Sequence, residues 1–402
     1  MRPLGLSDTV FYNLGDSFIS AMAVLDGPCD LSVLLADLEG VVGMLPALSE
    51  RPLRIGFWTF ARRVRKVDLT RHVAVLRDRT VTTVETAVPY LEKMRRSRIS
   101  MAVPPWRIFV LNPGEPGQAG SGPSPLSVVF MQIRHGLADA MRGLQVLARM
   151  GGQQPTPEHD ALARRLPDVD PASLVPEVPI HDVGISVLTV PRREINSEGD
   201  SGARFTAVAA AVVGDPELFP HARPLRGNIG RTRLVRRRGT GTALGNHMRM
   251  VTVRTQGREN AGRRWRIPGL SHAQDLQLAT WLVALAPRKL ARLAMRVWYS
   301  SFDAVATMIP LPRRLKLGGR AVTGVFGVPP LWGPVPLAMI ALTGGDDYHL
   351  TIFPGKGFTG SPARLLARLR ELFLGAGESV PQLVEPPETD KEARGRPAFA
   401  KR

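Results

Sequence analysis

The sequence contains a single cysteine, Cys29, among its 402 residues. One cysteine cannot form a disulfide within the chain, and it is too few for a cysteine-based zinc site. No pair of histidines has the spacing of metal ligands, so we expect no bound metal. The absence of a disulfide framework fits a reducing compartment, and we therefore expect a cytoplasmic protein.

Long apolar runs are also lacking. The longest, residues 276–287, is well below the roughly 20 residues that a transmembrane helix needs. Charges at Arg2, Asp8 and Asp16 interrupt the apolar core that an N-terminal signal peptide requires. The apolar part of this run, residues 276–286, is followed by the basic residues 288–296. It therefore has two interpretations: a helix peripheral to a membrane surface, or a buried core helix.

Acidic side chains are few relative to basic ones, with 35 Asp and Glu against 53 Lys and Arg and a formal net charge of +18. Such a charge favours anionic partners, including a phosphate-bearing co-substrate, an acidic carrier protein or an acidic lipid surface. Aromatic residues make up only 6% of the chain, few lie among the basic clusters, and no nucleic-acid motif accompanies them. We therefore expect no nucleic-acid partner.

One segment, residues 126–150, combines a buried strand with a helix. Its first eight residues are almost all apolar, which is typical of a strand buried on both faces. A helical stripe then follows, formed by Leu137, Met141, Leu144, Leu147 and Met150. His135 lies between the two elements, with Asp139 four residues later. A histidine at the exit of a buried strand is rigidly mounted, which suits acid–base chemistry.

Strands and helices are mixed irregularly along the rest of the chain. Apolar patterns predict strands at residues 18–25, 55–60, 106–111, 183–190, 249–254, 322–326, 336–342 and 348–353, and helices at 31–45, 83–96 and 363–374. Residues 205–213 fit either a helix or a strand. This order favours an α+β fold with two mixed-sheet sandwich domains over a single doubly wound sheet.

Domain boundaries are expected where the apolar pattern is lost. The proline-rich, charged segment 155–180 has no buried pattern and is expected to link an N-terminal domain, residues 1–154, to a C-terminal domain, residues 181–384. The polar, proline-containing end, residues 385–402, is expected to be disordered.

A sequence motif spans the exit of the central strand: Arg134-His135-Gly136-Leu137-Ala138-Asp139-Ala140. With the order of elements, it resembles the HHxxxDG motif of the wax ester synthase/acyl-CoA:diacylglycerol acyltransferase-like family, within the chloramphenicol-acetyltransferase and condensation-domain superfamily. The second histidine and the aspartate are kept, whereas Arg134 replaces the first histidine and Ala140 the glycine. The resemblance extends from residues 4–8 to the C-terminal helix, and it implies two chloramphenicol-acetyltransferase-like domains with an active-site tunnel between them.

Three shorter segments are similar to other motifs of this family. They are Pro105-Trp106-Arg107-Ile108, the turn Gly245-Asn246, and Val328-Pro329-Pro330-Leu331 followed by Gly333. Two family features are replaced: Thr206-Ala207 stands where an Asn-Asp pair is usual, and residues 307–312 stand where the family has S-N-V-P-G-P. The resemblance is therefore stronger for the fold than for the activity.

The resemblance implies a role for each residue of the candidate site. His135 is expected to act as a general base midway along the tunnel, taking a proton from an alcohol or amine and returning it to a thiolate. Asp139 is expected mainly to brace the motif through an arginine, either Arg134 or Arg142, rather than to orient the imidazole. If Arg134 instead faces the tunnel, its charge would lower the pKa of His135. Asn246, His247 and Met308 are candidates for lining the tunnel.

The sequence therefore predicts an acyltransferase that forms an ester or amide from a thioester on CoA or a carrier protein. Acyl-CoA or acyl-carrier protein is expected as co-substrate, with no permanently bound cofactor. Two alternatives stay open: a catalytically degenerate, condensation-like module that binds a carrier protein or another partner, and a related fold that cyclises or dehydrates a tethered intermediate.

Overall fold

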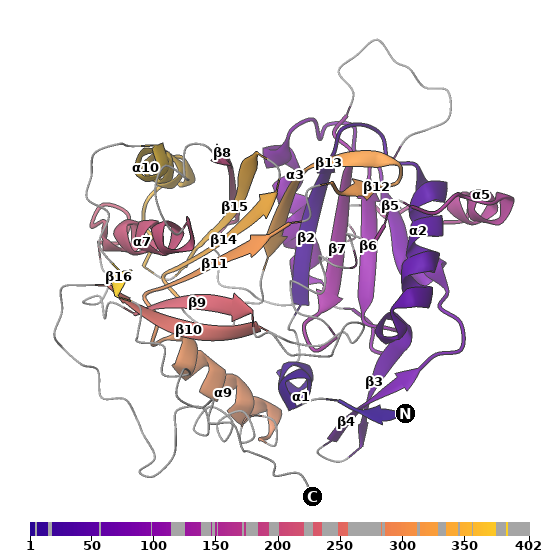
Figure 1. Cartoon of the computed structure of the whole chain (residues 1–402), viewed down its shortest axis with the longest axis horizontal. Helices are drawn as coiled ribbons and strands as arrows, with labels where there is room; N and C mark the ends of the chain where they lie inside the picture. Colours follow the sequence, from indigo (N-terminus) through magenta and orange to yellow (C-terminus); the bar gives the residue numbers. More distant parts are fainter. Residues whose placement is uncertain are drawn as a thin grey trace, which may run out of the picture.

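The described part of the computed structural model comprises residues 1–4, 6–14, 18–55, 58–97, 99–113, 125–137, 146, 149–150, 152–170, 173, 184–192, 201–220, 228–234, 248–255, 283, 286–311, 314–328, 335–344, 346–355, 357–374 and 383–384. Its helices are α1 (Leu6–Asn13), α2 (Leu31–Met44), α3 (Val84–Arg96), α5 (Pro157–Ala163), α7 (Ser201–Gly214), α9 (Arg288–Tyr299) and α10 (Pro362–Leu374). Most lie around two large sheets (Figure 1).

The first sheet has the strand order β12-β13-β2-β7-β6-β5. Its strands are β12 (Lys316–Leu317), β13 (Arg320–Val328), β2 (Phe18–Leu25), β7 (Val128–Arg134), β6 (Trp106–Leu111) and β5 (Val73–Leu76). All pairs are antiparallel except β5 with β6. The central strand β7 is buried along its whole length because the sheet is covered on both faces.

Helices α2 and α3 cover the two faces of the first sheet. Leu34, Leu35 and Leu38 of α2 share a core with Met131 and Ile133 of β7. On the opposite face, Leu91 of α3 shares a core with Phe130 of β7. The alternation of side chains along β7 therefore divides its apolar residues between two helices, which explains its unbroken apolar sequence.

Side chains cap both covering helices. The Asp30 carboxylate accepts hydrogen bonds from the backbone N–H groups of Ser32 and Val33 at the start of α2. At the end of α3, Arg107 of β6 donates to the carbonyl oxygens of Met94 and Ser97. Both sets of bonds satisfy helix-terminal groups that would otherwise lack partners. The Arg107 bonds also fix the end of α3 to the first sheet.

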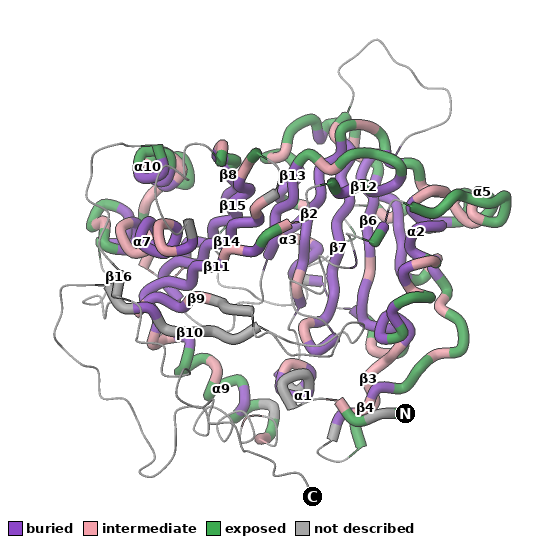
Figure 2. Tube along the Cα trace, in the orientation of Figure 1, coloured by how far each residue is buried: buried purple, intermediate pink, exposed green. Residues whose placement is uncertain are grey.

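The second large sheet has the order β16-β10-β9-β11-β14-β15-β8. Its strands are β16 (Leu383–Val384), β10 (Met248–Thr255), β9 (Asn228–Leu234), β11 (Ala304–Pro310), β14 (Leu337–Gly344), β15 (Asp347–Pro354) and β8 (Ser186–Pro191). Helices α7 and α10 pack on one of its faces. Figure 2 shows buried strands in both sheets and exposed outer surfaces on the helices.

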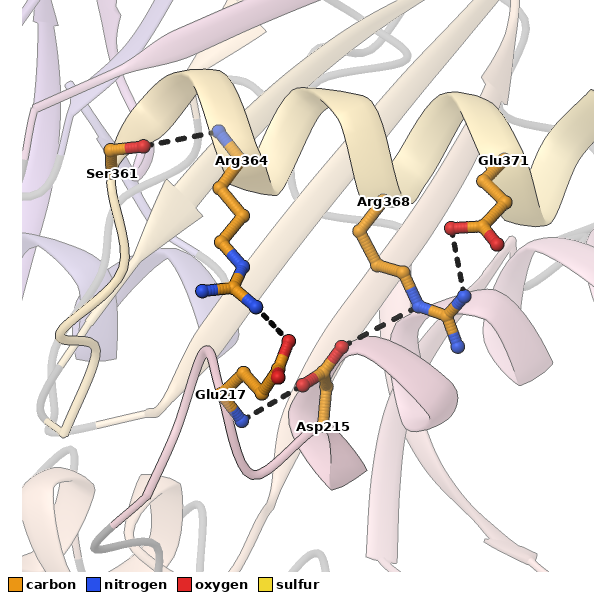
Figure 3. Close-up of polar contacts among 6 residues, drawn as sticks. All are labelled: Asp215, Glu217, Ser361, Arg364, Arg368 and Glu371. Carbon is orange, nitrogen blue, oxygen red and sulfur yellow. Dashed lines mark hydrogen bonds and ion pairs between the residues drawn. The ribbon is translucent and has the colours of Figure 1, made fainter.

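An ion-pair network joins α10 to the turn that follows α7 (Figure 3). Arg368 of α10 lies 3.5 Å from the Asp215 carboxylate and 2.9 Å from that of Glu371. Arg364, one turn earlier, pairs with Glu217. The Asp215–Arg368 pair is partly shielded from solvent, and its contacts fix α10 next to α7 over the second sheet.

A third, smaller sheet has the order β1-β4-β3 and lies beside α1. It consists of β1 (Arg2–Pro3), β3 (Glu50–Ile55) and β4 (Trp58–Arg63). The predicted single strand at residues 55–60 was wrong. Ile55 ends β3 and pairs with Trp58, which begins the antiparallel strand β4.

Strand β13 crosses from the second half of the chain into the first sheet. It pairs with β2, and the register shifts between Val322 and Gly324. Its face also approaches the second sheet closely, because a Cβ added to Gly324 would lie 3.3 Å from the His349 Cε1 atom of β15. Glycine therefore allows the two sheets to approach each other at this position.

The turn between β12 and β13 is a two-residue hairpin formed by Gly318 and Gly319, whose φ angles are 54° and 73°. Positive φ at both central residues is typical of a type I′ turn, which matches the twist of the flanking strands. The Gly318 carbonyl oxygen accepts a hydrogen bond from the Asp30 N–H at 3.1 Å. The hairpin is thus fixed to the N-terminus of α2.

The predicted α+β architecture with mixed sheets is confirmed. Residues 205–213, which the sequence left open, belong to helix α7. The expected linker 155–180 contains α5, which packs against α2 through Leu162 and Ala163. The expected disordered end, residues 385–402, lies outside the described residues.

Candidate functional site

The site begins where β7 leaves the first sheet. Arg134 ends the strand and pairs with Phe18 of β2. Its N–H donates to the Pro105 carbonyl oxygen at 3.0 Å, and its own carbonyl oxygen accepts from the Leu137 N–H at 2.8 Å. The turn that carries His135 is therefore held by backbone hydrogen bonds on both sides.

Helix α1 covers the His135 side chain. The Phe11 ring stacks on the imidazole with a centroid separation of 3.9 Å and an interplanar angle of 10°. Helix α1 is itself packed on α9, where Val10 and Leu14 cluster with Ala291. It also contacts β4, so His135 lies under a helix that touches elements from both halves of the chain.

Burial governs the protonation of His135. The residue is half-buried, and removal of its imidazole from water lowers its pKa from the ordinary 6.5 to about 4. A backbone hydrogen bond opposes this shift but is the smaller effect. The imidazole is therefore neutral at physiological pH, as a proton acceptor must be.

We expect the imidazole of His135 to titrate near pH 4 in the folded protein. Since the folded-state pKa lies below the ordinary value, the stability linked to His135 is complete above pH 6.5 and decreases as the pH falls toward 4. The measurement is a pH series of imidazole NMR spectra, with the resonance assigned by its loss in His135→Gln. A midpoint near 6.5 would contradict the burial of this ring.

Arg134 braces α1 through several contacts. One guanidinium nitrogen donates to the Tyr12 carbonyl oxygen at 3.1 Å and another lies 2.9 Å from the Met101 sulfur. The guanidinium carbon also lies 5.2 Å from the centre of the Tyr12 ring and 5.7 Å from that of Phe18. These contacts place a cation at the C-terminus of α1, where the helix dipole is favourable.

The alternative in which the charge of Arg134 lowers the pKa of His135 is not supported. Burial is the main cause of that shift, and Arg134 is not among the causes. The guanidinium group is instead engaged with Tyr12, Phe18 and Met101. Arg134 and His135 therefore have separate contacts on the same helix, α1.

Of the predicted site residues, the structure describes Arg134, His135 and Met308. Among these, it brings only Arg134 and His135 together. Asp139, Asn246 and His247 lie outside the described residues. Met308 lies on β11, half-buried against the core under α7 and α10. Its neighbour Ile309 belongs instead to a core that includes residues of the first sheet.

Sequence reasoning missed the aromatic cover of the site. Phe11 and Tyr12 contact His135 and Arg134, respectively. The sequence of α1 contains no motif that links it to the distant turn after β7. The apolar residues Val10 and Leu14 predict that one side of the helix is buried, but not which element it packs against. Only the three-dimensional contact assigns these aromatic residues to the site.

Two further features of the site's surroundings bear on the sequence-based expectations. Within the described ranges, no group of three or more His, Cys, Asp or Glu side chains could hold a metal ion. No described helix is both long and apolar enough to cross a bilayer.

No protein-family model and no curated protein sequence matches the chain. Solved structures do match. The wax ester synthase/diacylglycerol acyltransferase from Marinobacter aquaeolei VT8 is 14% identical with a TM-score of 0.58, and the match covers 93% of this chain and 98% of that one. A mutant starter condensation domain of rhizomide synthetase RzmA, in complex with C8-CoA and Leu-SNAC, is 12% identical with a TM-score of 0.58, covering 96% and 97%.

A second mutant structure of that condensation domain, in complex with C8-CoA, is 13% identical with a TM-score of 0.58 and covers 92% of this chain and 93% of that one. The matches extend over nearly the whole of each chain. At such low identity they establish the fold, which is that of wax ester synthase and condensation-domain structures.

Proposed function

We propose that the protein is an acyltransferase that moves an acyl group from a thioester to an alcohol or amine, with His135 as general base. The observation that carries this proposal is the neutral imidazole held at the end of β7 beneath α1. The fold supports it, because a protein of the same fold is a wax ester synthase/diacylglycerol acyltransferase and another was solved in complex with C8-CoA.

In the proposed reaction, His135 accepts the proton of the acceptor's O–H or N–H group as that atom attacks the thioester carbonyl carbon. The carbon–sulfur bond then breaks, and the imidazolium returns the proton to the departing thiolate. The low pKa of His135 makes its imidazolium a strong acid, which favours the second transfer. Burial thus weakens the base in the first step and assists the second.

The remaining residues of the proposed site have supporting roles. Arg134 positions α1, and through it Phe11, over the imidazole. We assign Asp139 a bracing role in the motif turn, and Asn246, His247 and Met308 remain candidates for the tunnel wall. The proposal includes no resident cofactor and no metal, only an acyl-CoA or acyl-carrier-protein thioester as co-substrate.

The net charge of +18 suits the phosphates of CoA and the acidic surface of a carrier protein equally well. Both donors therefore belong to the proposal. The proposal also includes a peripheral association with a membrane surface.

A second candidate is a non-catalytic module of the same fold that binds a carrier protein. Two observations favour it: Arg134 replaces the first histidine of the HHxxxDG pattern, and the Phe11 ring covers one face of the imidazole. Such a protein would bind acyl-carrier protein without releasing a thiol. A third candidate, cyclisation or dehydration of a tethered intermediate, would use His135 as base without acyl transfer.

The three candidates differ in their products. Purified protein is incubated with acyl-CoA or acyl-carrier protein and an alcohol or amine, and both thiol release and product mass are followed. Acyl transfer predicts acceptor-dependent thiol release and a product that contains acyl chain and acceptor. A cyclised product contains no acceptor, and a dehydrated product has lost one water. Binding without any thiol release would contradict the proposed activity.

A further inference from the structure

Helix α9 exposes an unusual amount of apolar surface. Leu290, Leu293 and Val297 are 56%, 57% and 63% exposed, and Trp298 is 39% exposed. Only eight large hydrophobic side chains are exposed within the described part of the chain, and four of them lie on this twelve-residue helix. Isolated exposed apolar residues are ordinary, whereas a group on one helix face marks an interaction surface.

The sequence of α9 divides its circumference into three sides. At 100° per residue, Ala291, Met295 and Tyr299 share one side. Ala291 and Met295 pack against α1, and Tyr299 is buried. Leu290, Leu293 and Val297 fall on a second side, and the exposed Lys289 and Arg296 lie between the two. Trp298 lies at the opposite border of the second side, next to Ala291, and its ring packs edge-on against Tyr299 and Phe302. The apolar side thus faces away from the protein and is bordered by positive charge.

Figure 1 places α9 at the edge of the molecule, next to α1 and away from the helices that cover the two sheets. Figure 2 shows that most of its length is exposed or half-buried.

We propose that the apolar side of α9 docks on an anionic membrane surface, with Leu290, Leu293 and Val297 inserted among the lipids and Trp298 at the edge of the inserted side. Charge complementarity favours this occupant, because Lys289 and Arg296 border the apolar side and the chain carries a net charge of +18. Amphipathic helices with this division of apolar and basic residues lie in the plane of the bilayer interface. Tryptophan also favours that interface.

This docking differs from the membrane contact considered from the sequence. That hypothesis assigned the apolar part to residues 276–286, most of which lie outside the described residues. The exposed side of α9 supplies both the apolar and the basic groups within twelve residues. The inference makes the peripheral membrane contact specific and requires no acyl transfer, so it can fail or succeed independently of the proposed activity.

The test is sedimentation of the full-length protein with vesicles. Phosphatidylcholine vesicles that contain phosphatidylserine are expected to bind the protein, with binding that weakens as salt is added, whereas vesicles of phosphatidylcholine alone bind it weakly. Leu293→Glu and Val297→Glu should each lower the partition coefficient about tenfold or more, since they remove apolar insertion and add a repelled charge. The double charge reversal Lys289→Glu with Arg296→Glu should also lower it.

Met44→Glu is the matched control, because Met44 is 50% exposed at the end of α2 and lies outside α9. It should bind vesicles like the unaltered protein. Wild-type protein that stays in the supernatant would overturn the inference, as would binding that is the same in Leu293→Glu and Val297→Glu. A dimer in solution that Leu293→Glu dissociates, without vesicle binding, would instead identify a second copy of the chain as the occupant.

Discussion

Replacement of His135 with alanine is expected to lower kcat for acyl transfer by about 10²–10⁴-fold, the usual contribution of a positioned general base. Alanine removes the only imidazole on the turn after β7, and Phe11 cannot accept the proton. His135→Gln should lose a similar factor, because glutamine fills part of the same space but is not a base. Thiol release under saturating acceptor and donor measures the effect.

His159→Ala provides the matched control. This histidine lies on α5, where its ring interacts with Glu39 and Thr156. Its replacement with alanine is expected to leave kcat unchanged. Thermal unfolding of each variant distinguishes lost catalysis from lost structure. Full activity in a folded His135→Ala protein would exclude this residue as the base.

Gly318→Ala is expected to destabilise the fold by about 2–5 kcal/mol. Its φ of 54° is left-handed, which costs a residue with a Cβ about 1–2 kcal/mol. The added Cβ would also lie 2.4 Å from the Cys29 sulfur and 2.8 Å from the Asp30 carbonyl oxygen. Relief of that overlap requires movement of the α2 N-terminus, and overpacking of this kind costs about 1–3 kcal/mol.

Gly319→Ala separates backbone strain from crowding. Gly319 also has a left-handed φ, 73°, but an added Cβ would find its nearest neighbour, the Val33 Cγ1 atom, at 4.0 Å. We expect this variant to lose only the backbone contribution of about 1–2 kcal/mol. Urea unfolding compares the two variants. Equal losses would show that crowding by Cys29 is unimportant, whereas partial rescue of Gly318→Ala by Cys29→Ala would support it.

Local sequence patterns were sufficient for many elements of the fold. Strand β7 is recognisable from its unbroken apolar sequence, because its side chains pack into two cores. Helix α2 is recognisable from its stripe of leucines, because these side chains pack into a single core. The pattern failed at residues 55–60, where apolar residues continue from β3 into β4. Periodicity describes burial, and burial does not reveal where a chain reverses direction.

Long-range pairing could not be predicted in the same way. The contact of Phe11 with His135 and the insertion of β13 beside β2 both join segments far apart in sequence. The two glycines of the hairpin before β13 are a recognisable turn signal, but the turn does not specify which sheet the following strand joins. The motif around His135 located the candidate base, while its cover and the brace from Arg134 required the structure.

The position of β13 has a consequence for the synthesis of the chain. Until residue 328 has left the ribosome, β2 lacks one neighbour and its backbone groups are open to pairing with other strands. At ordinary rates of translation this interval is about 15–60 s. The nascent first sheet therefore keeps an open edge at β2 until the last third of the polypeptide closes it.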